Sequence, residues 1–176
     1  MTITEALAEL KTIEKRIASK QQFVREYAFR IETLKDPFEK DGGSEKKILE
    51  EMQAISDLET RAVALRRAIQ SANEQTVVSL GGSDMTIADW LVWRREVAPS
   101  RERFLFEIRQ RLLASRDAVR KQNVNWGSNT PSEKPIDIVV NDDESQLSKD
   151  LENIKDILGQ LDGQLSLKNA TVMVEI

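Results

Sequence analysis

Apolar side chains recur in a heptad pattern through the N-terminal part of the chain. One row repeats every seven residues and consists of Ile3, Leu10, Ile17, Val24 and Ile31. A companion row lies three positions later and consists of Ala6, Ile13, Tyr27 and Leu34, with Lys20 as its one charged member. Such a repeat is typical of helices that wind around a partner. It predicts a long helix that starts at a capping box of Thr2 and Glu5 and ends near Asp36-Pro37.

A second heptad helix is predicted from about Ser44. Its two rows of apolar side chains are Ile48, Ile55, Ala62 and Ile69, and Leu58, Leu65 and Ala72. Two matched helices joined by a short loop form an antiparallel hairpin. We therefore expect residues 1–74 to form a coiled-coil helical hairpin. A hairpin of two long helices leaves part of its apolar seam uncovered, so we expect it to form a homo-oligomer.

Each of these helices has one charged residue within its seam, Lys20 in the first and Glu51 in the second. A single polar residue in a coiled-coil seam can fix the register and the number of helices. Alternatively, Lys20 lays its aliphatic stem along the seam and keeps its ammonium group in water. Both interpretations stay open at this stage. Both predict that leucine at position 20 raises the thermal stability of the protein.

The remainder of the chain, residues 75–176, alternates short β-branched runs with amphipathic helices. A helix is expected to start at Ser83 or Thr86, to bend at Pro99 and to continue as a longer helix. A last amphipathic helix precedes the C-terminus. Because a single strand leaves its backbone groups unpaired, we expect the strands to pair in a small sheet or between subunits. The predicted strands are 76–80, 136–140 and 171–176.

These elements predict a mainly α fold (α+β): a long antiparallel coiled-coil hairpin, a kinked central helix and a C-terminal helix with a small sheet of short strands. Residues 1–74 form the hairpin. Residues 75–176 form a strand-helix-strand-helix-strand region that packs on it as one cooperative unit. Strand exchange between subunits would place the C-terminal "TVMVEI" in the sheet of a neighbouring subunit.

Two tryptophans lie three positions apart in the segment "SDMTIADWLVWRREVAPSRERF". Trp90 and Trp93 would occupy neighbouring faces of one helix, and Leu91 and Val92 add apolar surface between them. A helix that is apolar on most of its faces is usually buried between several elements. We therefore favour a packing or subunit interface here. The alternative is an aromatic platform that binds a peptide or a nucleic-acid base.

Charge is unevenly distributed, although the chain as a whole has a net charge of −4. Residues 94–121 contain nine basic and four acidic residues, whereas residues 132–162 contain nine acidic residues and three lysines. A basic and an acidic helix can satisfy each other by packing, within or between chains. Nucleic-acid binding by the basic helix ranks below this, because Trp126 alone offers aromatic interleaving. The arginines of the predicted electrostatic interface are Arg94, Arg95, Arg101, Arg103, Arg109 and Arg111.

Composition and motifs exclude several classes of chemistry. The chain has no cysteine and no histidine, which removes thiol nucleophiles, disulfides, imidazole bases and the usual zinc ligands. "SLGGSDMT" lacks the pattern of a phosphate loop, and "NDDESQL" lacks the spacing of a calcium loop. We expect no enzyme, no cofactor and no metal site. No signal peptide is visible, and no apolar run approaches the about 20 residues that span a bilayer, so we expect a cytoplasmic protein.

Four segments carry a resemblance to a known family: "ITEALAELKTIEKRI", "MTIADWLVWRREV", "IDIVV" and "LDGQLSLKNATVMVEI". The chain resembles the septicolysin-like family, small helical bacterial proteins of unknown function with relatives in bacteriophages. It departs from the family at "ADW" and "WRREVAP", where shorter and more regular helix is usual. The resemblance brings no catalytic residues and implies phage structural proteins as partners. The name of the family also implies a membrane-acting toxin, which we rank third.

The function predicted from the sequence is that of a non-enzymatic structural or assembly protein. It would form a homo-oligomer and act as a component or assembly factor of a phage or prophage particle. The alternative is an oligomeric nucleic-acid-binding module that uses the basic helix 94–121. The predicted packing or oligomer interface consists of Leu10, Ile17, Val24, Ile31, Ile55, Leu65, Ile69, Trp90, Trp93, Val172 and Val174.

Overall fold

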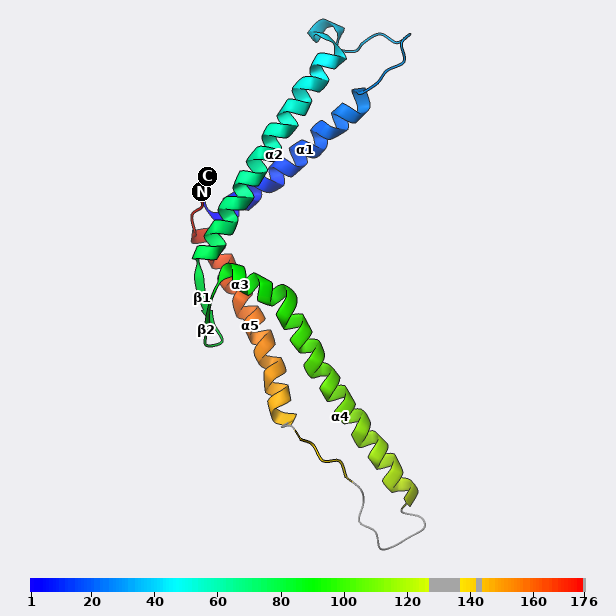
Figure 1. The fold of residues 1–176 in the computed structure, drawn as a ribbon, viewed down its shortest axis with the longest axis vertical. Helices are drawn as coiled ribbons and strands as arrows, with labels where there is room; N and C mark the ends of the chain where they lie inside the picture. The colour runs from blue at the N-terminus through cyan, green and yellow to red at the C-terminus, as the bar shows by residue number, and fades with distance from the viewer. Residues whose placement is uncertain (127–136, 142–143, 176) are drawn as a thin grey trace. The chain divides into compact units, whose positions relative to one another are not determined.

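The computed structural model describes residues 1–126, 137–141 and 144–175, and it confirms the mainly α fold with a small antiparallel sheet (Figure 1). The elements are α1 (Ile3–Tyr27), the 3-10 helix η1 (Glu39–Asp41), α2 (Gly43–Gln75), β1 (Val77–Leu80), β2 (Ser83–Thr86), α3 (Ile87–Val92), the π-helix η2 (Trp93–Val97), α4 (Ala98–Trp126) and α5 (Glu144–Thr171). They belong to two compact units. The first is Met1–Thr76 with Leu165–Ile176, and the second is Val77–Gln164. Residues 165–176 thus group with the hairpin, whereas the sequence placed them in the second region.

Helices α1 and α2 run antiparallel in the first unit (Figure 1). Thr2 and Glu5 form the predicted capping box, in which the Thr2 hydroxyl oxygen accepts from the Glu5 N–H and a Glu5 carboxylate oxygen accepts from the Thr2 N–H. The apolar rows of the two helices face each other, as the heptad pattern predicts. The buried core of this unit consists of Ile3, Ala6, Leu10, Ile13, Leu65, Ala72 and Val174.

Helix α1 ends at Tyr27, earlier than the heptad pattern predicts. Ile31 was predicted to lie in the seam, but it lies in the loop after α1 and is 67% exposed. Three aromatic rings explain the early end. Phe38 returns from the loop and packs against Phe23 and Tyr27, with ring centroids 5.5 and 4.9 Å away, so aromatic contacts close the seam before it reaches residue 31.

The predicted C-terminal strand 171–176 is wrong for most of its length, because Thr171 ends α5 and Met173 forms only an isolated bridge, within its own chain, while residue 176 lies outside the described residues. Thr2 and Met173 form an isolated antiparallel bridge. The N–H of Ile3 donates to the carbonyl oxygen of Val172 at 3.1 Å, and the N–H of Val174 donates to that of Met1 at 2.8 Å. Because α1 begins at Ile3, Met1 and Thr2 offer too little extended backbone for a longer ladder.

The second unit begins with a β-hairpin. Val77 pairs with Thr86 and Leu80 with Ser83, and the two-residue turn is Gly81-Gly82. Both glycines have positive φ, +57° and +78°, which suits the tight turns that join twisted strands. The sequence predicts β1 and the turn, but the pattern did not predict β2.

The predicted strand 136–140 is wrong for residues 137–140, which lie in irregular structure, and residue 136 falls outside the described ranges. A β-branched run becomes a strand through cross-strand pairing. In the described part of the chain, β1 pairs with β2, and residues 137–140 pair with neither of them.

Proline 99 bends the central helix without ending it, and the chain turns between α3 and α4 (Figure 1). Thr86 and Asp89 form the capping box that starts α3. Because Pro99 cannot donate a hydrogen bond and its ring crowds the preceding turn, the backbone widens into a π-helix over Trp93–Val97. Helices α4 and α5 then pack through a core made of Ala98, Leu105, Leu147 and Ile154.

Candidate functional site

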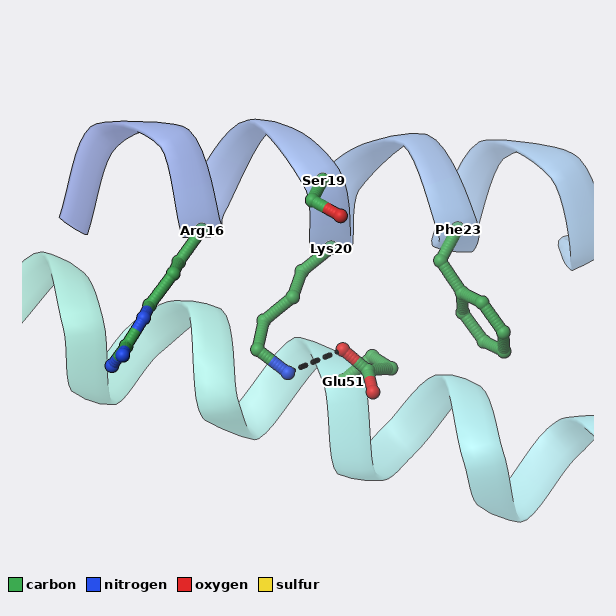
Figure 2. A pocket seen from close by; sticks show the side chains of 5 residues that line it. All are labelled: Arg16, Ser19, Lys20, Phe23 and Glu51. Carbon is green, nitrogen blue, oxygen red and sulfur yellow. Dashed lines mark hydrogen bonds and ion pairs between the residues drawn. The ribbon is translucent and has the colours of Figure 1, made fainter. Parts of the chain in front are cut away.

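An open groove lies between α1 and α2 in the first unit (Figure 2). Its volume is about 260 Å³. Helix α1 contributes residues spaced by three, one and three positions, which places them along one side of the helix. Helix α2 contributes a single carboxylate. The lining residues are Arg16, Ser19, Lys20, Phe23 and Glu51.

The two charged residues of the seams meet in this groove. The Lys20 ammonium Nζ lies 2.7 Å from Glu51 Oε2 and donates a hydrogen bond to it across the two helices. The two side chains are 30% and 26% exposed, so water screens the pair less than it screens a surface ion pair. An ammonium group has three donors, and this bond uses one of them. The sequence shows both charges, but it did not predict that they are partners.

Arg16 and Ser19 supply further donors to the groove. The Arg16 side chain extends from α1 toward α2 (Figure 2). It forms no ion pair with any residue within the described ranges. Ser19 adds a hydroxyl next to Lys20. The groove therefore offers more hydrogen-bond donors than acceptors, and Lys20 already occupies the Glu51 carboxylate.

Phe23 forms the apolar wall of the groove, and its ring continues into the aromatic cluster near the end of the hairpin. The centroid of the Tyr27 ring lies 4.8 Å from that of Phe23 in a tilted arrangement. These contacts hold Phe23 in place beside the charged side chains. The groove thus combines a cationic part with a fixed aromatic surface, which suits an amphipathic ligand.

Asp36 organises the loop that leads into α2. Its Oδ1 accepts hydrogen bonds from the Ser44 hydroxyl at 2.7 Å and from the Phe38 N–H at 2.9 Å, and its Oδ2 accepts from the Ser44 N–H at 2.9 Å. The bonds from Ser44 and Phe38 stabilise the charged form and lower the pKa of Asp36 to about 2. Arg30 adds a smaller effect in the same direction. The sequence of the loop predicts the end of the first helix, but it does not predict the hydrogen bonds that Asp36 accepts.

Most residues of the predicted oligomer interface pack within their own unit. Leu10, Leu65 and Val174 are buried in the core of the first unit, and Ile17, Ile69 and Val172 pack against it. Ile55 is buried and Val24 is half-buried. The buried members of this set therefore pack within the single chain, and they offer no surface to a second folded chain.

The tryptophan pair lies in the second unit. Trp90 is 2% exposed, and its indole Nε1 donates a hydrogen bond to the Val78 carbonyl oxygen at 2.9 Å. Trp93 is half-buried and meets Trp90 edge to face, with ring centroids 5.5 Å apart. An aromatic platform for a ligand needs an accessible ring face, and the buried Trp90 does not offer one.

The six arginines of the predicted electrostatic interface, together with Arg116, divide into two groups. Arg94 pairs with Asp162 of α5 at 2.8 Å, Arg116 pairs with Glu144 at the start of α5, and Arg95 pairs with its neighbour Glu96. The second group is exposed and forms no ion pair in the part of the chain that the structure describes. At about 100° per residue, its members point to different sides of α4 and do not form one stripe. They are Arg101, Arg103, Arg109 and Arg111.

Exposed apolar side chains also occur on both units, a feature that the heptad pattern did not predict. On α2, Leu49, Met52 and Val63 are separated by three and eleven residues and therefore share one side of the helix, away from the buried seam. We call these three residues the α2 strip. On α4, Phe106 and Leu113 are seven residues apart and share one side, and we call them the α4 pair.

Comparisons with known proteins concern the fold alone. No protein-family model and no curated protein sequence matches the chain. The structure is similar to the crystal structure of a functionally unknown conserved protein from Corynebacterium diphtheriae, with a TM-score of 0.56, 22% identity and coverage of 99% of each chain. Within the described residues, no helix is long and apolar enough to cross a membrane, and no cluster of three or more acidic residues is arranged to hold a metal ion.

Proposed function

We propose that this chain is a non-enzymatic structural or assembly protein that forms a homo-oligomer. The observation that carries the proposal is the α2 strip, a row of three exposed apolar side chains on the outer side of a long helix. Exposed apolar rows of this kind mark places where another protein surface packs. The α4 pair offers a second surface of the same kind.

A self-associating α2 strip fits the geometry of helix packing. Leu49 and Met52 are adjacent along one side of α2, and Val63 lies three turns farther on the same side. Two copies of α2 in contact along this side would bury the three side chains at positions of an a/d row, with the polar Ser56 and Glu59 at the two row positions between Met52 and Val63. The gain in free energy would be about 0.8 kcal/mol for each methylene group buried.

The biological setting proposed is a phage or prophage particle or its assembly, with other phage structural proteins as further partners. This part of the proposal is supported by the resemblance of the sequence to the septicolysin-like family. A role for the chain in a particle is compatible with exposed apolar rows on both units, because each row can receive a separate neighbour.

Nucleic-acid binding is the second candidate function, and the exposed arginines of α4 favour it. Arg101, Arg103, Arg109 and Arg111 have no partner charge within the described ranges, so they are free to contact phosphate groups. Their spread around α4 and the net charge of −4 place this candidate below self-association. Binding of DNA or RNA at low salt, lost steeply as salt rises, would support it.

The test of the main proposal is the absolute mass in solution, measured by light scattering behind size exclusion at low and high salt. We expect a multiple of the 20.0 kDa chain mass that survives high salt. Replacing Leu49, Met52 and Val63 together by glutamine should return the mass to that of one chain with unchanged helical content. Asp57→Asn, on another exposed side of α2, is the control. A monomeric wild-type protein, or an oligomer that the triple variant leaves intact, would overturn the proposal.

A further inference from the structure

We propose that the groove between α1 and α2 binds a small organic carboxylate that carries an aromatic or aliphatic group. This inference is independent of the proposed self-association, because the groove residues lie outside the α2 strip and the α4 pair.

The donors of the groove select an anion. Arg16 presents a guanidinium group that has no ion pair in the described part of the chain, and its planar fork fits the two oxygens of a carboxylate. Lys20 keeps two of its three N–H donors after its bond to Glu51. Ser19 can add a hydroxyl donor beside them. All three residues come from one side of α1 and line the same space (Figure 2).

The charge balance of the groove favours one additional negative charge. Two cations and one carboxylate line it, and Glu51 is already bonded to Lys20 at 2.7 Å. A cationic ligand would have to compete with Lys20 for Glu51 and would be repelled by Arg16. A carboxylate ligand between Arg16 and Lys20 would instead be attracted by both cations, while Glu51 stays bonded to Lys20. The partial burial of Lys20 strengthens this attraction relative to a fully exposed lysine.

The aromatic wall selects the rest of the ligand. Phe23 is fixed by its contacts with Tyr27 and Phe38, so a ligand that packs on it meets an ordered apolar surface. The volume of about 260 Å³ falls below the range of about 300–1,000 Å³ typical of sites for drug-sized molecules. A ligand such as 3-phenylpropionate is small enough for the site, with its carboxylate between Arg16 and Lys20 and its ring directed toward Phe23, which lies on the other side of the Lys20–Glu51 pair (Figure 2).

The experiment is an NMR titration of the full-length protein, labelled with ¹⁵N, with 3-phenylpropionate. A ligand of this size in an open groove should bind with a Kd on the order of 1 mM. We expect saturable shifts of the amide signals of residues 16–23 and of Glu51. Acetate, which lacks the apolar group, should bind at least about tenfold more weakly, and phenethylammonium, which reverses the charge, should produce no saturable shift.

Two variants separate the groove from the general charge of the helix. Arg16→Gln should weaken binding of 3-phenylpropionate about tenfold, whereas Lys15→Gln, the same charge change on an exposed neighbouring residue, should leave it unchanged. Glu51→Gln removes the one negative charge of the groove and should strengthen binding. Circular dichroism checks that each variant stays folded. Equal effects of Arg16→Gln and Lys15→Gln, or saturable binding of phenethylammonium at the same signals, would overturn the proposal.

Discussion

The indole of Trp90 donates a hydrogen bond from Nε1 to the carbonyl oxygen of Val78, 2.9 Å away in the interior of the second unit. The bond joins α3 to the β-hairpin that precedes it. Trp90 is therefore both an apolar core residue and a polar link between two elements. Buried tryptophans are commonly satisfied in this way, because an unpaired indole N–H in the interior is costly.

Phenylalanine at position 90 should lower the free energy of unfolding by about 2–4 kcal/mol. The smaller ring leaves a cavity, and the Val78 carbonyl loses its buried donor. Urea unfolding followed by circular dichroism measures the change. Trp93→Phe is the matched control, because Trp93 is half-buried, and it should cost less than half as much. Equal losses for the two variants would show that the hydrogen bond contributes little.

The pair of Lys20 and Glu51 changes the expectation for leucine at position 20. Lys20→Leu alone leaves the half-buried Glu51 carboxylate without its partner, so the single variant should not gain the thermal stability predicted from the sequence. Lys20→Leu combined with Glu51→Leu extends the apolar seam and should raise the melting temperature above that of the wild type. A double-mutant cycle should give a coupling energy of about 0.5–1 kcal/mol between the two positions. Independent effects of the two substitutions would contradict the contact.

Asp36 should make the loop before α2 sensitive to acid. Its folded pKa of about 2 lies below the ordinary value of 3.8, so its stabilising effect is fully present above pH 3.8 and is lost as the pH falls toward 2. Asp36→Asn should speed hydrogen exchange of the Ser44 and Phe38 amides at pH 7, and the difference from wild type should shrink as the pH falls through 2, where half of the carboxyl groups are protonated. Asp41→Asn, in the same loop, is the control. A difference that persists unchanged at pH 2 would contradict the role of the carboxylate.

The two glycines of the β-turn should respond differently to alanine. Both have positive φ, so both substitutions strain the backbone by about 1 kcal/mol. A Cβ at position 81 would also lie 2.8 Å from Cδ1 of Ile157, whereas one at position 82 would meet nothing within 4 Å. Gly81→Ala should therefore lower the melting temperature more than Gly82→Ala does, as measured by thermal unfolding. The reverse order would contradict the packing of the turn against α5.

The helices could be predicted from the sequence because their signals are local. Heptad spacing and the caps at Thr2 and Thr86 depend on residues a few positions apart, and the structure contains both caps. The prediction of a strand at 136–140 was wrong for residues 137–140, because the composition of a segment says nothing about whether it has a pairing partner. Strand β2 is polar, with the sequence "SDMT", and it is a strand because the Gly81-Gly82 turn folds it onto β1.

These local patterns could not predict the groove between α1 and α2. Lys20 and Glu51 are 31 positions apart and come together because α1 and α2 run antiparallel. Aligning the two predicted helices antiparallel, with Leu10 near Leu65, would have brought the two charges to within about one helical turn of each other. The end of α1 was misplaced for a related reason, since Phe38 packs on Tyr27 from across the loop.

The pairing of Thr2 with Met173 has a consequence for the order in which the protein is completed. Val174 is buried in the same core as Ile3 and Leu10, so the first unit is discontinuous in sequence and the second unit is an insertion within it. During synthesis the hairpin emerges first, but its base lacks these contacts until residues 172–174 have left the ribosome. The contacts that complete the base of the hairpin therefore form only after the whole of the inserted unit has been synthesised.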